Sequence, residues 1–175
     1  MGIKENLAEI RTRITTAAQN CGRSPDAVNL VAVSKTVPVD KIREGIDAGA
    51  DHLGENYVQE AREKVEILAD QPLTWHFIGH LQSNKAKYAA RLFDLIHSVD
   101  SVKLARALDK EAKKAGRVQS ILIQVNIAGR VQSILILVSS PARLTWIRID
   151  CTLPAFFASL SRALANLTES TEWIR

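Results

Sequence analysis

The sequence predicts an α/β fold, an incomplete (β/α)8 barrel of the TIM-barrel type with about five to six strands and an extra N-terminal helix. Three observations lead to this prediction. Short apolar runs that suit buried strands alternate with amphipathic segments that suit helices. The strands recur at intervals of roughly 20 to 30 residues, as parallel βαβ units do. No GxGxxG motif follows the first apolar run, which argues against an open dinucleotide-binding sheet.

The extra helix comes first in the chain. Its apolar residues fall at steps of four, three and four residues, which places them in one stripe: Ile3, Leu7, Ile10 and Ile14. Gly22 follows and is expected to end this helix, because glycine readily adopts the left-handed conformation common just after a helix.

Five strands are expected after the extra helix. The first, residues 30–33, is a continuous apolar run, which predicts a strand buried on both faces. The other four are residues 52–54, 75–78, 95–99 and 121–125. Amphipathic helices are expected between the strands, and Ser83 and Ser101 are predicted to cap two of them.

The charge of the chain raises nucleic-acid binding as a rival class of function. The net charge is +4 and the isoelectric point is near 9.2. However, Lys and Arg alternate with Asp and Glu throughout residues 4–117, whereas binding to a phosphate backbone needs a one-sided basic stripe. Residues 130–175 contain five Arg and three acidic residues and so supply part of the net positive charge. No nucleic-acid partner is therefore predicted.

The location is expected to be cytoplasmic. No apolar run approaches the roughly 18 residues that a membrane span requires, and the polar N-terminus has no export signal, so no membrane partner is predicted. Cys21 and Cys151 lie far apart without metal-ligand spacing, which favours free thiols in a reducing compartment.

Polar residues follow the predicted strands, at the barrel face where active sites lie. They are Lys35, Glu55 with Asn56, Gly79 with His80, Ser98 with Asp100, and Asn126. Lys35 is the strongest candidate because it ends the first strand and is expected to enter the barrel mouth. Partial burial there lowers the pKa of an amine and leaves it nucleophilic toward carbonyl groups. The alternative is a lysine that only extends from a strand end toward solvent.

Other candidates give weaker signals. His76 and His80 are four residues apart, but the glutamate of an HExxH motif is absent and the segment suits a strand and loop, so no metal site is predicted. Lys85 lies at a predicted helix start and is assigned to the surface. Asp100 precedes Ser101 and suits a turn before the next helix.

Three sequence blocks resemble the signature blocks of the pyridoxal phosphate homeostasis protein family, in the same order and spacing. They are residues 31–36 (VAVSKT), 54–60 (GENYVQE) and 75–85 (WHFIGHLQSNK). The resemblance implies a barrel similar to the N-terminal domain of alanine racemase. It also implies that Lys35 holds pyridoxal 5'-phosphate as a Schiff base. Asn56 is expected to contact the cofactor ring or shape the pocket, with a turn-stabilising role as the alternative.

The resemblance implies a binding protein that acts in intracellular homeostasis of vitamin B6 and amino acids, and that is not an enzyme. The expected partners are the cofactor and pyridoxal phosphate-dependent apo-enzymes, and a monomer is expected. One alternative is an enzyme like alanine racemase, which needs a second proton-transferring group on the other face of the cofactor. Another alternative is a truncated product that folds poorly and binds nothing.

The pattern changes after Asn126. Residues 116–123 (GRVQSILI) recur as residues 129–136, which we interpret as a local duplication followed by a change of reading frame. We therefore divide the chain into a family-like barrel portion, residues 1–128, and a repeated segment with a divergent tail, residues 129–175, which is not a separate domain.

The divergent tail has its own consequences for fold and function. Residues 137–175 contain no Gly, Lys or His, and the glycine-rich phosphate loop and the arginine that the resemblance places there have no match. Residues 131–138 suit a strand, and residues 156–167 suit an amphipathic helix. Five or six strands do not close an eight-stranded barrel, so an open sheet edge, reduced stability and weakened cofactor binding are expected.

Overall fold

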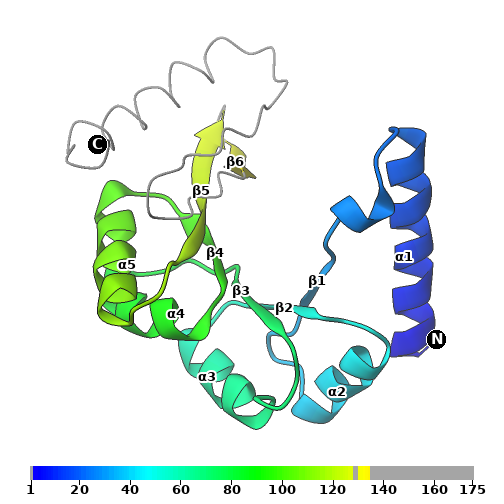
Figure 1. Ribbon diagram of the computed structural model, residues 1–175, viewed down its shortest axis with the longest axis horizontal. Helices are drawn as coiled ribbons and strands as arrows, with labels where there is room; N and C mark the ends of the chain where they lie inside the picture. The colour runs from blue at the N-terminus through cyan, green and yellow to red at the C-terminus, as the bar shows by residue number, and fades with distance from the viewer. Residues whose placement is uncertain (1, 128–129, 135–175) are drawn as a thin grey trace. The chain divides into compact units, whose positions relative to one another are not determined.

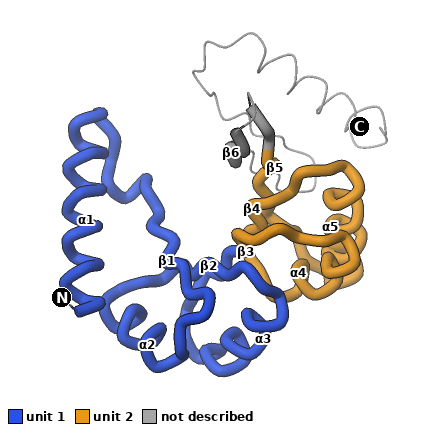
Figure 2. The backbone as a smooth tube through the Cα atoms, turned by 180° about the vertical axis from the view of Figure 1, so that it is seen from behind, with its two compact units in different colours: residues 1–76 blue, residues 77–175 orange. Residues whose placement is uncertain are grey.

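The computed structural model describes residues 2–127 and 130–134. Helices alternate with strands along the chain, as Figure 1 shows. The described residues fall into two compact units, which lie within residues 1–76 and residues 77–175 and are coloured separately in Figure 2. This division by compactness does not test the predicted boundary after residue 128, which rests on sequence pattern and stays a prediction.

The first unit opens with the predicted extra helix. Its elements are α1 (Ile3–Asn20), the 3-10 turn η1 (Pro25–Ala27), β1 (Val31–Val33), α2 (Val39–Asp47), β2 (His52–Glu55), α3 (Val58–Ile67) and β3 (Thr74–Phe77), which ends one residue beyond the unit. The strand order is β1-β2-β3, and β1 pairs with β2 in parallel. This is the topology expected of consecutive βα units.

The apolar stripe of α1 is buried only in part. Leu7 is buried, whereas Ile10 is 40% exposed. The helix ends where predicted, because Gly22 has a φ of +68°, which suits glycine and terminates the helical hydrogen-bond pattern. The guanidinium of Arg11 donates a hydrogen bond to the carbonyl oxygen of Gly49, just after α2, and so ties α1 to the next helix.

The second unit continues the alternation. Its elements are η2 (Ser83–Lys85), α4 (Ala86–Leu92), β4 (Leu95–Val99), α5 (Val102–Lys114), β5 (Ser120–Ile127) and β6 (Arg130–Ile134). β4 and β5 are parallel. The core includes Phe77 and Phe93, whose ring centroids lie 5.1 Å apart at 60°, a tilted arrangement that aromatic rings favour.

The two predicted helix caps have different outcomes. Ser101 caps α5 as predicted, since its Oγ accepts a hydrogen bond from the backbone N–H of Leu104. The prediction for Ser83 was wrong. Ser83 is the first residue of η2 rather than its cap, and α4 begins three residues later without a side-chain cap. A serine that precedes a helical segment does not by itself determine where the helix starts.

The described part of the repeated segment, Arg130–Ile134, forms a strand that does not extend the parallel pattern. β6 lies antiparallel to β5, with Ile123 opposite Ile134 and Ile127 opposite Arg130. Only two residues separate the two strands, whereas a parallel connection needs roughly a dozen or more residues. The two-residue connection therefore requires the reversed direction.

The predicted fold class is confirmed: the described chain is an α/β fold with five strands in βα alternation and a sixth in a hairpin. The prediction that the first strand is buried on both faces was wrong. Val31 and Ala32 are half-buried and Val33 is 52% exposed, because β1 has β2 as its one neighbour among the described strands. The helix predicted within residues 156–167 lies outside the described residues, as does Cys151, whereas Cys21 carries a free exposed thiol.

Candidate functional site

Lys35 lies in the turn that follows β1. β1 ends at Val33, and the backbone N–H of Val37 donates a hydrogen bond of 3.1 Å to the carbonyl oxygen of Ser34. Lys35 and Thr36 are therefore the two central residues of a four-residue turn. The side chain of Lys35 is exposed, which corrects the expectation of partial burial. The physical reason is the position of β1, whose end is covered by no further strand among the described residues.

The turn contains an unusual backbone conformation. Thr36 has a φ of +59°, and it is the one non-glycine residue with a positive φ in the described chain. A β-branched residue is strongly disfavoured in this left-handed region, which glycine or asparagine normally occupies at the third position of a turn. Surrounding contacts must therefore hold the turn in this conformation.

A buried ionic cluster supplies such contacts. The cluster, which we call the Lys64 cluster, consists of Glu55 at the end of β2 and of Glu60 and Lys64 on α3. The Nζ atom of Lys64 lies 2.8 Å from Oε1 of Glu55 and 2.7 Å from Oε1 of Glu60. Lys64 is 6% exposed and Glu55 is fully buried, so the ion pair between them is shielded from water.

The Lys64 cluster binds the turn on both sides of Lys35. Lys64 donates a hydrogen bond of 2.5 Å to the carbonyl oxygen of Ser34, and the Oγ of Ser34 donates one of 2.7 Å to Glu55. On the other side, the backbone N–H of Thr36 donates a hydrogen bond of 2.6 Å to Glu60. The residues before and after Lys35 are thus fixed, while its own side chain is left exposed.

The cluster perturbs the ionisation of its members. The hydrogen bond from Lys64 lowers the pKa of Glu60, and the N–H of Thr36 lowers it further, against the opposing effect of burial. Burial by itself lowers the pKa of Lys64, but the hydrogen bonds and charges of Glu55 and Glu60 outweigh it, so the pKa of Lys64 is raised. Glu60 and Lys64 are therefore favoured in their charged forms at neutral pH.

Asn56 lies beside Lys35 in the register of the sheet. β1 and β2 pair in parallel with Val33 opposite Gly54. Lys35 and Asn56 each lie two residues beyond that pair, so the two candidates lie at adjacent strand ends. Asn56 is half-buried. The structure thus places the two predicted cofactor-binding residues at the carboxyl ends of neighbouring strands.

The remaining candidates from the sequence lie elsewhere. In the second unit, the Nδ1 of His80 lies 3.8 Å from the Oδ2 of Asp100, and both exposed side chains line an open depression of about 410 Å³. Ser98 is buried in β4, and Asn126 lies within β5 rather than after it. Lys85 is half-buried at the end of η2.

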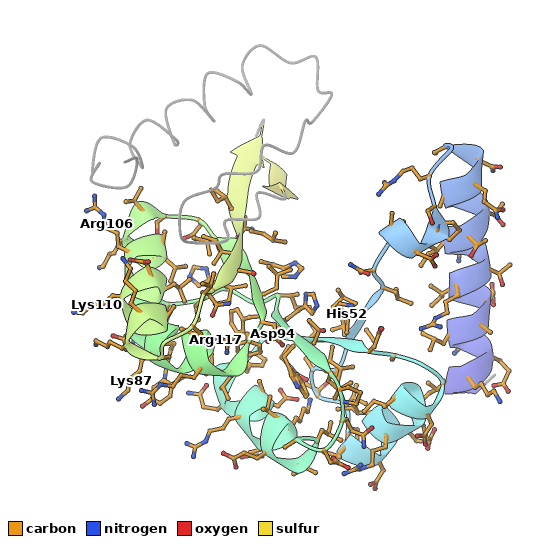
Figure 3. All side chains as sticks on the ribbon, viewed as in Figure 1. His52, Lys87, Asp94, Arg106, Lys110 and Arg117 are labelled. Carbon is orange, nitrogen blue, oxygen red and sulfur yellow. The ribbon has the colours of Figure 1, made fainter. Side chains whose placement is uncertain are left out.

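His76, one of the two histidines for which no metal site is predicted, is paired with another histidine. The Nε2 of His76, which is 4% exposed, lies 2.8 Å from the Nδ1 of His52, a residue of β2 labelled in Figure 3. Within the described residues, no group of three or more His, Cys, Asp or Glu side chains is arranged to hold a metal ion. Nor is any described helix both long enough and apolar enough to span a membrane.

Sequence reasoning missed Lys64 and Glu60 as part of this site. Their spacing of four residues on one helix is visible in the sequence, but that spacing usually indicates an ion pair on the helix surface. Nothing in the local pattern shows that α3 turns this pair toward the end of β1.

The chain is similar to several known proteins. The sequence profile described as "Alanine racemase, N-terminal domain" matches residues 5–131. The pyridoxal phosphate homeostasis protein of Escherichia coli (strain K12) is 44% identical over 128 residues, which cover 71% of this chain and 55% of that protein. The protein of the same name from Pseudomonas aeruginosa is 46% identical over 125 residues, covering 71% of this chain and 54% of the relative.

A solved structure is also similar. The structure of PipY from Synechococcus elongatus PCC7942 with PLP bound has a TM-score of 0.63 and 34% identity, covering 99% of this chain and 85% of PipY. The structure of PipY without PLP has a TM-score of 0.65 and 35% identity. The chain spans about half the length of the curated relatives it matches.

Proposed function

This chain belongs to the alanine racemase N-terminal domain family, and we propose that it binds pyridoxal 5'-phosphate as a Schiff base on Lys35. The observation that carries the proposal is the exposed amine of Lys35, held in a turn at the carboxyl end of β1 by the buried Lys64 cluster. The curated relatives named pyridoxal phosphate homeostasis protein, and the solved PipY structure with PLP bound, support this choice of ligand.

The chemistry requires an accessible primary amine. Pyridoxal 5'-phosphate supplies an aldehyde whose carbon is electrophilic. The nitrogen of Lys35 adds to that carbon, a C=N bond forms, and one molecule of water leaves. Water or a second amine reverses the attachment, so a single lysine is sufficient to hold and to release the cofactor.

The described residues fit this attachment. Lys35 is exposed, and its neighbours Ser34 and Thr36 are held by hydrogen bonds, so the amine projects from an ordered turn. Asn56, two residues past the last paired position of β2, is the side chain we assign to the ring or to the wall of its pocket. We assign no phosphate-binding residues, since the glycine-rich phosphate loop that the resemblance implies has no match in residues 137–175.

The biological role we propose is intracellular homeostasis of vitamin B6 and amino acids, without catalysis. The names of the curated relatives support homeostasis as the role. Transfer of the cofactor to apo-enzymes, a monomeric state and a cytoplasmic location are further parts of the proposal. The rival hypothesis is an enzyme like alanine racemase. An assay for amino-acid racemisation with the cofactor present would detect that activity.

Reductive trapping tests the proposal directly. The chain is mixed with pyridoxal 5'-phosphate, reduced with borohydride, digested and mapped by mass spectrometry. Lys35 is expected to carry most of the label, and Lys35→Ala is expected to lose the visible absorbance of the Schiff base. Lys41→Ala is the matched control, because Lys41 is an exposed lysine of the same unit, paired with Glu44 at 2.6 Å. Equal labelling of the exposed lysines would contradict the proposal.

A further inference from the structure

The turn that presents Lys35 is not stable through its local sequence alone. Thr36 has a φ of +59°, which its branched side chain disfavours. The hydrogen bond from Val37 to Ser34 closes the turn but places no restraint on the peptide N–H between Lys35 and Thr36. Glu60 supplies an acceptor for that N–H at 2.6 Å.

Charged side chains of the Lys64 cluster form hydrogen bonds with the backbone of this turn. Lys64 donates to Glu55, to Glu60 and also to the carbonyl oxygen of Ser34. Burying a lysine and a carboxylate costs free energy, and apolar side chains of similar volume often stabilise a core equally well. Packing between α3 and the sheet therefore does not by itself explain the cluster. The hydrogen bonds that the cluster makes to the backbone on both sides of Lys35 explain its presence.

We infer that Lys64 and Glu60 are positioning residues for the Schiff-base lysine: they hold the Ser34–Val37 turn, with Thr36 in the left-handed conformation, and thereby direct Lys35 toward the incoming aldehyde. This inference rests on the proposed function of Lys35. Neither residue reacts with the cofactor. Fixing the turn before binding removes an ordering step from the condensation, which is the general way in which orientation accelerates a reaction.

Glu60 offers the cleanest test, because its side chain is 26% exposed and lies at the edge of the cluster. Glu60→Met removes the acceptor for the N–H of Thr36 while leaving the buried pair of Lys64 and Glu55. Glu60→Gln restores an oxygen acceptor without the charge. Glu66→Met is the matched control, since Glu66 is an exposed acid on the same helix, paired with Arg62 at 3.0 Å.

The first measurement needs no cofactor. Amide hydrogen exchange in the full chain is expected to show protection of the Thr36 N–H in the wild type, in Glu60→Gln and in Glu66→Met. Glu60→Met is expected to lose that protection, with its circular dichroism unchanged. Equal protection of Thr36 in all four proteins would overturn the inference.

The second measurement is the rate of borohydride-trapped labelling at Lys35 with pyridoxal 5'-phosphate. We expect Glu60→Met to slow labelling roughly 10-fold, with recovery to within about threefold in Glu60→Gln and no change in Glu66→Met. Labelling of Lys35 at the wild-type rate in Glu60→Met would overturn the inference and leave the proposed function standing. A wild-type chain that is not labelled at Lys35 would overturn both.

Discussion

Two ion pairs with the same spacing and the same order of charges lie on different helices of this protein. Glu60 and Lys64 on α3 are 2.7 Å apart, and Asp109 and Lys113 on α5 are 3.0 Å apart. The side chain of Lys64 is 8% exposed, whereas that of Lys113 is 59% exposed. Lys64 also binds Glu55 from β2 and the backbone of Ser34.

The comparison indicates that the spacing of two charges on a helix does not by itself determine how much their ion pair contributes to stability. On α5, the basic side chains lie on the outer face of the helix, where Arg106 and Lys110 point away from it in Figure 3. Water and salt screen charges in such a position. On α3, the partners contributed by other elements turn an ordinary helical pair into a buried network that holds a turn.

The largest expected effect is that of Lys64→Met. Removing the ammonium leaves Glu55 buried without a counter-charge, so we expect the free energy of unfolding to fall by about 3–5 kcal/mol. Urea unfolding near neutral pH, followed by circular dichroism, measures this change. A loss below about 1 kcal/mol would mean that the ion pairs of Lys64 contribute no more than an exposed pair does, which would contradict the difference drawn between α3 and α5.

Glu60→Met is expected to lower the free energy of unfolding by about 1–2 kcal/mol, since it removes a charge-assisted hydrogen bond to Lys64 and an acceptor for Thr36. The effect should depend on pH. The pKa of Glu60 is lowered below its ordinary value of 4.5 in the folded protein. Its stabilisation is therefore complete above that value and is lost as the pH falls through the lower folded-state pKa.

The pH dependence sharpens the test for Glu60. Urea unfolding of the wild type and of Glu60→Met is compared at neutral pH and at several values below 4.5. The two unfolding free energies should converge on acidification. A difference that stays constant with pH would show that Glu60 acts through packing rather than through its charge.

Thr36→Asn is expected to raise the free energy of unfolding by about 0.5–1 kcal/mol, because asparagine tolerates the left-handed backbone far better than a β-branched residue does. Thermal unfolding with Thr36→Val as the control measures the effect, since valine keeps the branched shape. Stabilisation by both substitutions would show that the hydroxyl, rather than the φ angle, is responsible.

The smallest effect is expected on α5. Lys113→Met should change the free energy of unfolding by no more than about 0.5 kcal/mol, since exposed ion pairs contribute little. The same urea experiment used for Lys64→Met provides the measurement. A loss comparable to that of Lys64→Met would mean that spacing on the helix, and not burial, determines how much these ion pairs contribute to the free energy of unfolding.

Much of the fold was predictable from local pattern. The strand predicted at residues 95–99 coincides with β4, and those at 52–54 and 75–78 match β2 and β3 within one residue at each end. Lys35 and Asn56 were predicted to follow parallel strands, and parallel pairing brings the ends of β1 and β2 together. Their roles toward the cofactor remain predictions. The exposure of Lys35 was not predicted, because it depends on which strands lie beside β1.

The sequence by itself determined the alternation of strands and helices, the ends marked by Gly22 and Ser101, and the lysine that follows β1, because periodicity and capping act over a few neighbouring residues. Only the tertiary structure decided that Lys64 lies beneath the turn of Lys35 and that Glu55 is fully buried. These features arise where residues 21 to 30 positions apart meet, and no local pattern specifies such a meeting.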